Sequence, residues 1–220
     1  MTCDDLSHFV RVASKLLQAD DVASSTATLA ETWSCAQLIE ALNSTHDDAV
    51  LLSAISLGLI GSEQEAPALV ARLGHHDASI VAACEDALWS IWVRSAGSSH
   101  VNQLHQAMHV ARESDWEQAL PLLSDLIESR PDYAEARHQY AIAHHALGNA
   151  AVARDAYQKT LELNPLHYPA RCALGHLAVE ANEFRNALRE YEAALAIHPQ
   201  LEVRELVPQL SQAIAKRIVA

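Results

Sequence analysis

Histidine is the residue that offers this sequence most of its chemistry, with 13 copies in 220 residues. A neutral imidazole binds metals, and its charge changes near neutral pH. His105 and His109 are four residues apart, which on a helix lets two imidazoles share a metal ion. No third ligand is obvious nearby, and the Glu of a zinc-protease signature is absent between them. We therefore expect no metal site and keep His105 and His109 as the alternative pair.

Other catalytic signatures are missing from the sequence. The dipeptides His75-His76 and His144-His145 point to different faces of a helix, so neighbours cannot chelate together. There is no glycine-rich phosphate loop, Gly-x-Ser-x-Gly elbow or dinucleotide-binding turn. The four cysteines are scattered without Cys-x-x-Cys spacing, which favours reduced, buried thiols over a disulfide framework or a zinc ribbon. We expect a protein that is not an enzyme and needs no cofactor.

The charge balance is strongly acidic, with 28 Asp and Glu against 15 Lys and Arg and a net charge of −13. Nucleic-acid binding needs clustered cations and is not expected. Residues 1–99 hold 13 of the acids and only 4 of the cations. This half either has a plain solvated surface or meets a basic partner. No apolar run is long enough for a membrane span, and the first residues do not resemble a signal peptide, so a cytoplasmic location is expected.

A 34-residue period organises the second half of the chain. Half of all residues are hydrophobic and only 6 are glycine, which favours an all-helical fold. A period in this range predicts a solenoid of helical hairpins, with close helix approach at the small residues and a proline after each hairpin. The aligned positions are Pro131, Pro165 and Pro199; Ala107, Ala141 and Gly175; Ala119, Ala153 and Ala187; and Leu123, Tyr157 and Tyr191.

These residues resemble the tetratricopeptide repeat. The three units are expected at 100–133, 134–167 and 168–201. One departure from the family pattern is the early aromatic of the first helix, replaced by Gln103, Arg137 and Arg171. Residues 202–220 place Leu206, Leu210, Ile214 and Ile218 on one helical face, as expected of a helix that caps a solenoid.

A fainter, 31-residue period occupies the first half. The apolar positions Leu38, Leu42, Val50, Leu57 and Ile60 recur as Leu69, Leu73, Val81, Leu88 and Ile91, which resembles a pair of HEAT-like repeats. We expect a HEAT-like region at 1–95 with a leading helix at 4–18, a linker or frayed helix start at 20–28, and a junction at 96–99. The predicted fold is an all-α, right-handed α-solenoid of two HEAT-like units, three tetratricopeptide units and a capping helix.

The family resemblance implies that the first helices line a concave groove whose outward residues contact a ligand. This surface is largely apolar with a histidine stripe, which suits an extended peptide or amphipathic helix with apolar anchors. In the alternative, Met108, Ile142 and Val179 pack against the cap or the first half. His138, His145 and His176 could also titrate together, making ligand affinity depend on pH. The predicted groove residues are Leu104, Met108, Arg112, His138, Ile142, His145, Cys172, His176 and Val179.

One family use of such grooves is disfavoured by the sequence. Relatives that clamp acidic C-terminal tails need Lys, Arg and Asn at five groove positions to hold carboxylates. The corresponding residues here are Leu104, Met108, Gln139, Pro169 and Ala173. A general co-chaperone role is therefore not expected.

The predicted function is a non-enzymatic scaffold or adaptor that binds a peptide or helix of another protein. A histidine-based metal-binding or catalytic accessory protein is the first alternative. The second is a structural protein that self-associates, a homo-oligomer, through the Trp89 and Trp92 face or the apolar end of the cap. We expect both tryptophans in the core, because large aromatics at helical spacing usually pack inward.

Overall fold

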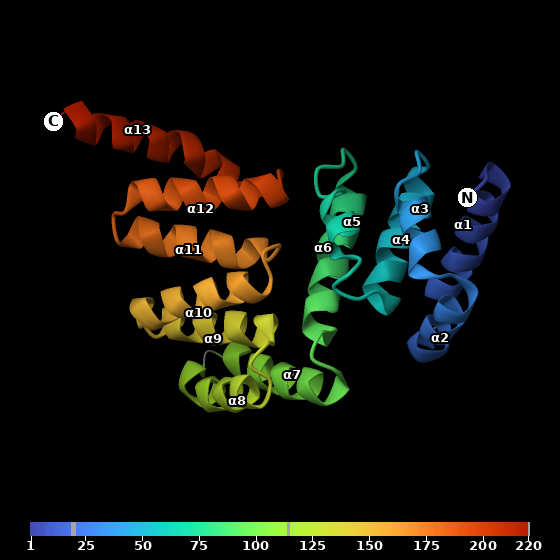
Figure 1. The fold of residues 1–220 in the computed structure, drawn as a ribbon, viewed down its shortest axis with the longest axis horizontal. Coiled ribbons are helices and arrows are strands. Elements are labelled where there is room, and N and C mark those ends of the chain that lie inside the picture. Colours follow the sequence, from blue (N-terminus) through green and yellow to red (C-terminus); the bar gives the residue numbers. More distant parts are fainter. Residues whose placement is uncertain (19–20, 114, 220) are drawn as a thin grey trace. The chain divides into compact units, whose positions relative to one another are not determined.

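The computed structural model describes residues 1–18, 21–113 and 115–219 of the chain (Figure 1). Within these ranges the secondary structure is helical throughout, as predicted, and no described helix is long and apolar enough to cross a membrane. The chain divides into two compact units, Met1–Ser95 and Ala96–Ala220.

The described part of the first unit is built from short helices. The segment expected as a linker or frayed start is helical from Val22, so the linker interpretation is wrong there. The Asp21 carboxylate accepts from the Ser24 amide, and the hydroxyls of Thr26 and Thr28 donate to carbonyls four residues earlier. The helices are α1 (Cys3–Leu17), α2 (Val22–Thr32), α3 (Cys35–Leu42), α4 (Asp47–Ile60), α5 (Ala66–Val70) and α6 (Ala78–Arg94).

The core of the first unit forms around α4, which contacts α1, α2, α3 and α6. Phe9 of α1 and Trp33, after α2, are buried and meet edge to face with ring centroids 5.1 Å apart. Leu57 of α4 and Leu88 of α6 are fully buried. The pairs α3–α4 and α5–α6 follow the 31-residue period, and their HEAT-like identity stays a prediction.

The second unit is a stack of helical hairpins in which each helix contacts the next one along the chain (Figure 1). Helices α9 and α11 begin at Ala134 and Tyr168, which are equivalent positions of successive repeats. The helices are α7 (Ser98–Arg112), α8 (Trp116–Ser129), α9 (Ala134–Ala146), α10 (Ala150–Leu163), α11 (Tyr168–Glu180), α12 (Phe184–Ile197), a 3-10 turn η1 (Glu202–Glu205) and α13 (Leu206–Val219).

The aligned small and large residues of the 34-residue period form the interior of this stack. The alanines of both helices and the large residue of each second helix are buried, Tyr157 and Tyr191 among them. Because hydrophobic burial is the main favourable term in folding, these positions hold the hairpins together. Val203 of η1 and Leu210 of α13 join Tyr191 in the last cluster of this interior.

Two turns show the repeat in the backbone. Gly148 and Asn182, at equivalent positions of successive repeats, both have positive φ, 77° and 58°. The next amide donates back into the first helix in both turns, from Asn149 to the His144 carbonyl and from Glu183 to the Ala178 carbonyl. This is the left-handed helix ending that favours Gly and, among other residues, Asn.

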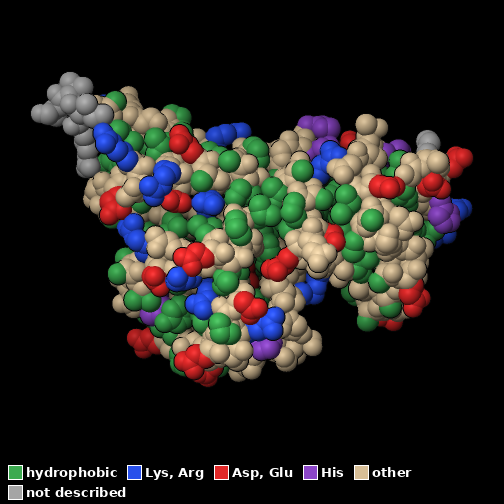
Figure 2. Space-filling view, in the orientation of Figure 1, with side chains coloured by type: hydrophobic (Ala, Val, Ile, Leu, Met, Phe, Trp, Pro, Cys, Tyr) green, Lys and Arg blue, Asp and Glu red, His purple; other side chains and the backbone are tan. Residues whose placement is uncertain are grey.

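Charged side chains are unevenly spread over the two units. On the face shown in Figure 2, Lys and Arg side chains lie mainly over the second unit, whereas most charged side chains of the first unit are acids. This agrees with the sequence, in which residues 1–99 hold 4 of the 15 cations.

Candidate functional site: the first-helix face of the second unit

The predicted groove residues lie on α7, α9 and α11, the first helices of the three hairpins. Two of them are buried, Leu104 at 0% exposure and His138 at 8%. Leu104 shares the inward side of α7 with buried Ala107 and Ala111. The structure therefore takes Leu104 and His138 out of the surface that a partner could touch. Arg112 and His176 are exposed, and the partly exposed remainder is Met108, Ile142, His145, Cys172 and Val179.

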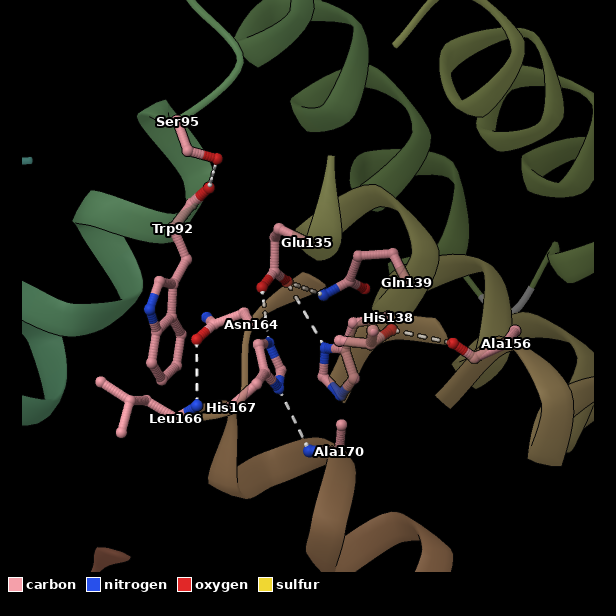
Figure 3. A network of polar contacts seen from close by, with 11 residues as sticks. Trp92, Ser95, Glu135, His138, Gln139, Ala156, Asn164, Leu166, His167 and Ala170 are labelled. Atoms are coloured by element: carbon pink, nitrogen blue, oxygen red, sulfur yellow. Dashed lines mark hydrogen bonds and ion pairs between the residues drawn. The ribbon is translucent and has the colours of Figure 1, made fainter. Parts of the chain in front are cut away.

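His138 turns inward because it belongs to a buried polar cluster with Glu135 and His167 (Figure 3). The Glu135 carboxylate lies 3.1 Å from His167 Nε2 and 3.5 Å from His138 Nδ1. Gln139 Nε2 donates to the same carboxylate at 2.8 Å. All three cluster residues are buried. The cluster ties the first turns of α9 to the residue that precedes α11.

Burial and pairing set the protonation of this cluster. Burial alone would raise the pKa of Glu135, but the hydrogen bonds and charges of His138 and His167 outweigh it and hold that pKa well below its usual range. Burial, assisted by the neighbouring His138, lowers the pKa of His167. Near neutral pH the cluster therefore holds an ionised Glu135 beside a neutral His167.

The cluster has the composition of a metal site, since one ligand atom from each residue lies within 4.8 Å of the others. Its hydrogen bonds do not fit a metal. His167 Nδ1 accepts the Ala170 amide at 3.2 Å, so it caps α11 and has no proton. In a neutral imidazole the proton is then on Nε2, the nitrogen that faces Glu135. A metal at Nε2 would require the opposite tautomer and the loss of the cap.

A second such group, Asp47, His75 and His76, lies in the first unit and is more exposed. Both histidine Nε2 atoms are 3.8 Å from the Asp47 carboxylate. His75 Nδ1 accepts the Asp77 amide at 3.1 Å, which again places the proton on Nε2. His105 and His109, the alternative pair, are exposed on α7 and belong to no three-ligand group among the described residues.

Two polar pairs of the described structure involve predicted groove residues, one joining α9 to α11 and one joining α11 to α12. His145 Nε2 lies 3.1 Å from both oxygens of Glu180. The Tyr191 hydroxyl is 2.7 Å from His176 Nδ1. Burial raises the pKa of Tyr191 to about 12, so its hydroxyl keeps the proton and donates it to His176. Burial, together with His145, lowers the pKa of His176.

The predicted histidine stripe is thus divided. His138 lies in the buried cluster, whereas His145 and His176 stay at the surface with different partners. Sequence reasoning missed His167, because histidine is not among the preferred capping residues. Its position directly before the first residue of α11 was the available signal.

Comparison with known proteins identifies the repeat. Residues 104–167 match the family model of the tetratricopeptide repeat, and no curated protein matches the chain. The first TPR domain of Spaghetti (RPAP3), solved bound to the HSP90 peptide SRMEEVD, is 18% identical with a TM-score of 0.50, over 53% of this chain and 93% of that one. The NMR structure of the first TPR domain of human RPAP3 is 17% identical with a TM-score of 0.50, over 55% and 96%.

Identities this low establish the fold alone. The family match, the 34-residue period and the stacked hairpins agree on the same part of the chain. Residues 104–167 are a tetratricopeptide repeat region, and the hairpins of the second unit continue its 34-residue period.

Proposed function

We propose that the protein is a non-enzymatic interaction scaffold whose first-helix face in the second unit binds a peptide or helix of a partner protein. Partly exposed apolar side chains on all three first helices carry this proposal: Met108 on α7, Ile142 on α9, and Cys172 and Val179 on α11, the last three also packing against the interior. Apolar anchors spaced over neighbouring helices suit an extended peptide or an amphipathic helix. We place this function in the cytoplasm, where scattered free cysteines are ordinary.

The chemistry of the face argues against an acidic peptide tail as the ligand. The similar RPAP3 domain was solved with the HSP90 peptide SRMEEVD. Here none of the five positions that would clamp carboxylates holds a cation. The side-chain amide of Gln139, one of the five, already donates to the Glu135 carboxylate. The exposed Glu180 adds negative charge to the face. We therefore propose a ligand whose affinity comes from apolar side chains.

Affinity capture with a double variant tests the proposal. Met108→Glu with Ile142→Glu should lose the partners that the wild type retains, because a buried carboxylate opposes apolar contact. The matched control is Val152→Glu, which changes a 43% exposed valine on the second helix α10. Circular dichroism checks that each variant is folded, and exposed Arg112→Glu probes the same face without touching the core. Partners retained equally by wild type and both face variants would contradict the proposal.

A further inference from the structure

The first unit has an open groove of its own, between α4 and α6. Its volume is about 430 Å³, in the range of ligand-binding clefts. The described lining residues all belong to these two helices: Leu51, Ile55, Gly58 and Leu59 of α4, and Ser79, Ala82, Ala83, Asp86, Ala87 and Ser90 of α6.

The two helices line the groove with side chains of different size. Helix α4 contributes Leu51, Ile55 and Leu59, each partly exposed and four residues apart on one face. At 1.5 Å per residue this stripe extends for about 12 Å, or about two helical turns. Helix α6 contributes mainly small side chains, three alanines and two serines, so the space beside the α4 stripe stays open. The result is an apolar trough long enough for two or three anchor side chains of a helix.

The base of the groove is rigid. A Cβ added to Gly58 would come within 3.0 Å of Ala87 Cα, so the two helices are in direct backbone contact there. The Arg94 guanidinium at the end of α6 donates to the carbonyls of Gly58 and Gly61 at the end of α4. A groove held in this way does not depend on a ligand for its shape.

One residue that lines the groove is acidic, and an exposed aromatic follows it on α6. Asp86 lines it and is exposed, and Trp89, one helical turn further along α6, is 42% exposed. Asp48, also exposed, begins the face of α4 that continues with Leu51. None of the described lining residues is a cation. A carboxylate beside an exposed indole suits Lys or Arg, which pair with the first and stack on the second.

The first unit has few cations to oppose its acids, and two of them have partners in the structure. Arg94 is bonded to backbone carbonyls, and the Arg72 guanidinium donates to Asn43 Oδ1. Residues 1–99 hold only four cations against 13 acids. The net negative charge of the unit therefore attracts a basic ligand and repels an acidic one before contact is made.

We propose that the α4–α6 groove binds a basic amphipathic helix of a partner protein. Apolar residues of that helix, spaced three or four apart, fill the trough along Leu51, Ile55 and Leu59. Its Lys and Arg residues pair with Asp86 and stack on Trp89. A second copy of this chain is a poor occupant, because its net charge is −13. This surface is separate from the first-helix face, so either proposal can fail alone.

Calorimetric titration of the full chain with a designed peptide tests the inference. The probe is a 15-residue helix with leucines at positions 4, 8 and 12 and lysines on its other faces. We expect binding that weakens about tenfold in Asp86→Lys and about fivefold in Trp89→Ala, the range of a lost charge pair and a lost cation–π contact. The control Asp125→Lys makes the same charge change at an exposed site on α8 and should bind within about twofold of wild type.

Three results would overturn the proposal. The first is equal loss in Asp86→Lys and Asp125→Lys, which would mean attraction to net charge without a site. The second is equal binding of a peptide with glutamates in place of the lysines. The third is concentration-dependent dimerisation of the free protein that Asp86→Lys abolishes, which would give the groove to a second copy of the chain.

Discussion

The ring of Tyr191 lies against the Cα of Gly175 so closely that a Cβ there would overlap it. The same tyrosine donates its hydroxyl to His176, the next residue of α11, at 2.7 Å. In the preceding hairpin the corresponding residues are Ala141, Ile142 and Tyr157, and Ile142 offers no acceptor. The glycine therefore makes room for a tyrosine that leans across it to reach a surface histidine. A surface polar contact and an interior packing choice are coupled in the third hairpin.

This coupling predicts that Gly175→Ala destabilises the protein. Overpacking a close contact costs about 1–3 kcal/mol in free energy of unfolding, and urea denaturation would measure it. Adding Tyr191→Leu should recover part of the loss, because the pair then matches Ala107 and Leu123 of the first hairpin. A single variant as stable as the wild type would contradict the close packing, and so would a double variant no better than the sum of its parts.

The buried cluster predicts that stability falls with acid. The pKa of His167 is lowered in the folded protein, so the unfolded chain binds more protons once the pH falls below the ordinary histidine value of 6.5. The contribution of His167 to the free energy of unfolding is complete above pH 6.5 and is lost as the pH falls toward its lowered pKa in the folded protein. Glu135, whose pKa is also lowered, adds a further loss below its ordinary value of 4.5. Thermal melting between pH 7.5 and 5 should show the first effect.

The variant His167→Asn separates this cluster from other histidines. Asparagine still caps α11 through its side-chain oxygen and has an amide to donate, but it does not titrate. Its melting temperature should depend less on pH between 6.5 and 5 than that of the wild type. His144 and His176 also have lowered pKa values and leave a residual slope. Identical slopes in the two proteins would assign the effect to those residues.

The hairpins could be predicted from the sequence because each repeat contacts its neighbours in the same way. Pro131, Pro165 and Pro199 each follow a helix end by two residues, so the period shows where the helices stop. The site could not be predicted to the same depth. The family pattern turns His138 outward, whereas its partner His167 lies at the far end of the same repeat and holds it inside with Glu135. A repeat pattern contains no information about such pairs.

The same limit explains one rejected alternative and one error in the first half. The segment from Val22 to Thr28 has the composition of a linker, but its hydroxyls bond to carbonyls of their own helix and remain satisfied there. Trp89 was expected in the core with Trp92, yet it is 42% exposed while Trp92 is buried. The two are three residues apart, and the side of a helix that faces the interior depends on neighbours that the sequence does not name.

The buried thiol of Cys84 predicts a slow reaction with Ellman's reagent. Burial raises the pKa of Cys84 to about 12 and that of Cys172 to about 11, so both are almost wholly protonated at pH 8. In a Cys3→Ser variant, which leaves Cys35, Cys84 and Cys172, Cys84 should react only as the protein unfolds in guanidinium. Cys35 is less buried and should react first. Rapid reaction of Cys84 in the folded protein, followed by mass spectrometry of tryptic peptides, would contradict its burial.

The hydrogen bonds of Arg94 predict that this side chain holds α6 against the end of α4. Its guanidinium donates to the Gly58 and Gly61 carbonyls, and the amide of Gly61 already closes the end of α4 on Leu57. Arg94→Met keeps the aliphatic length but leaves both carbonyls without this partner. The free energy of unfolding should fall by about 1–3 kcal/mol, the cost of a carbonyl that is left without a hydrogen bond and shielded from water. Arg94→Lys should lose less, because one ammonium can still reach a carbonyl but cannot span two as a planar guanidinium does. The control Arg11→Met changes an exposed arginine that bonds to His8, and its stability should stay within about 0.5 kcal/mol of wild type. If Arg94→Met unfolds at the same urea concentration as Arg11→Met, the guanidinium does not hold the helices together, and the rigid base inferred for the groove loses its support.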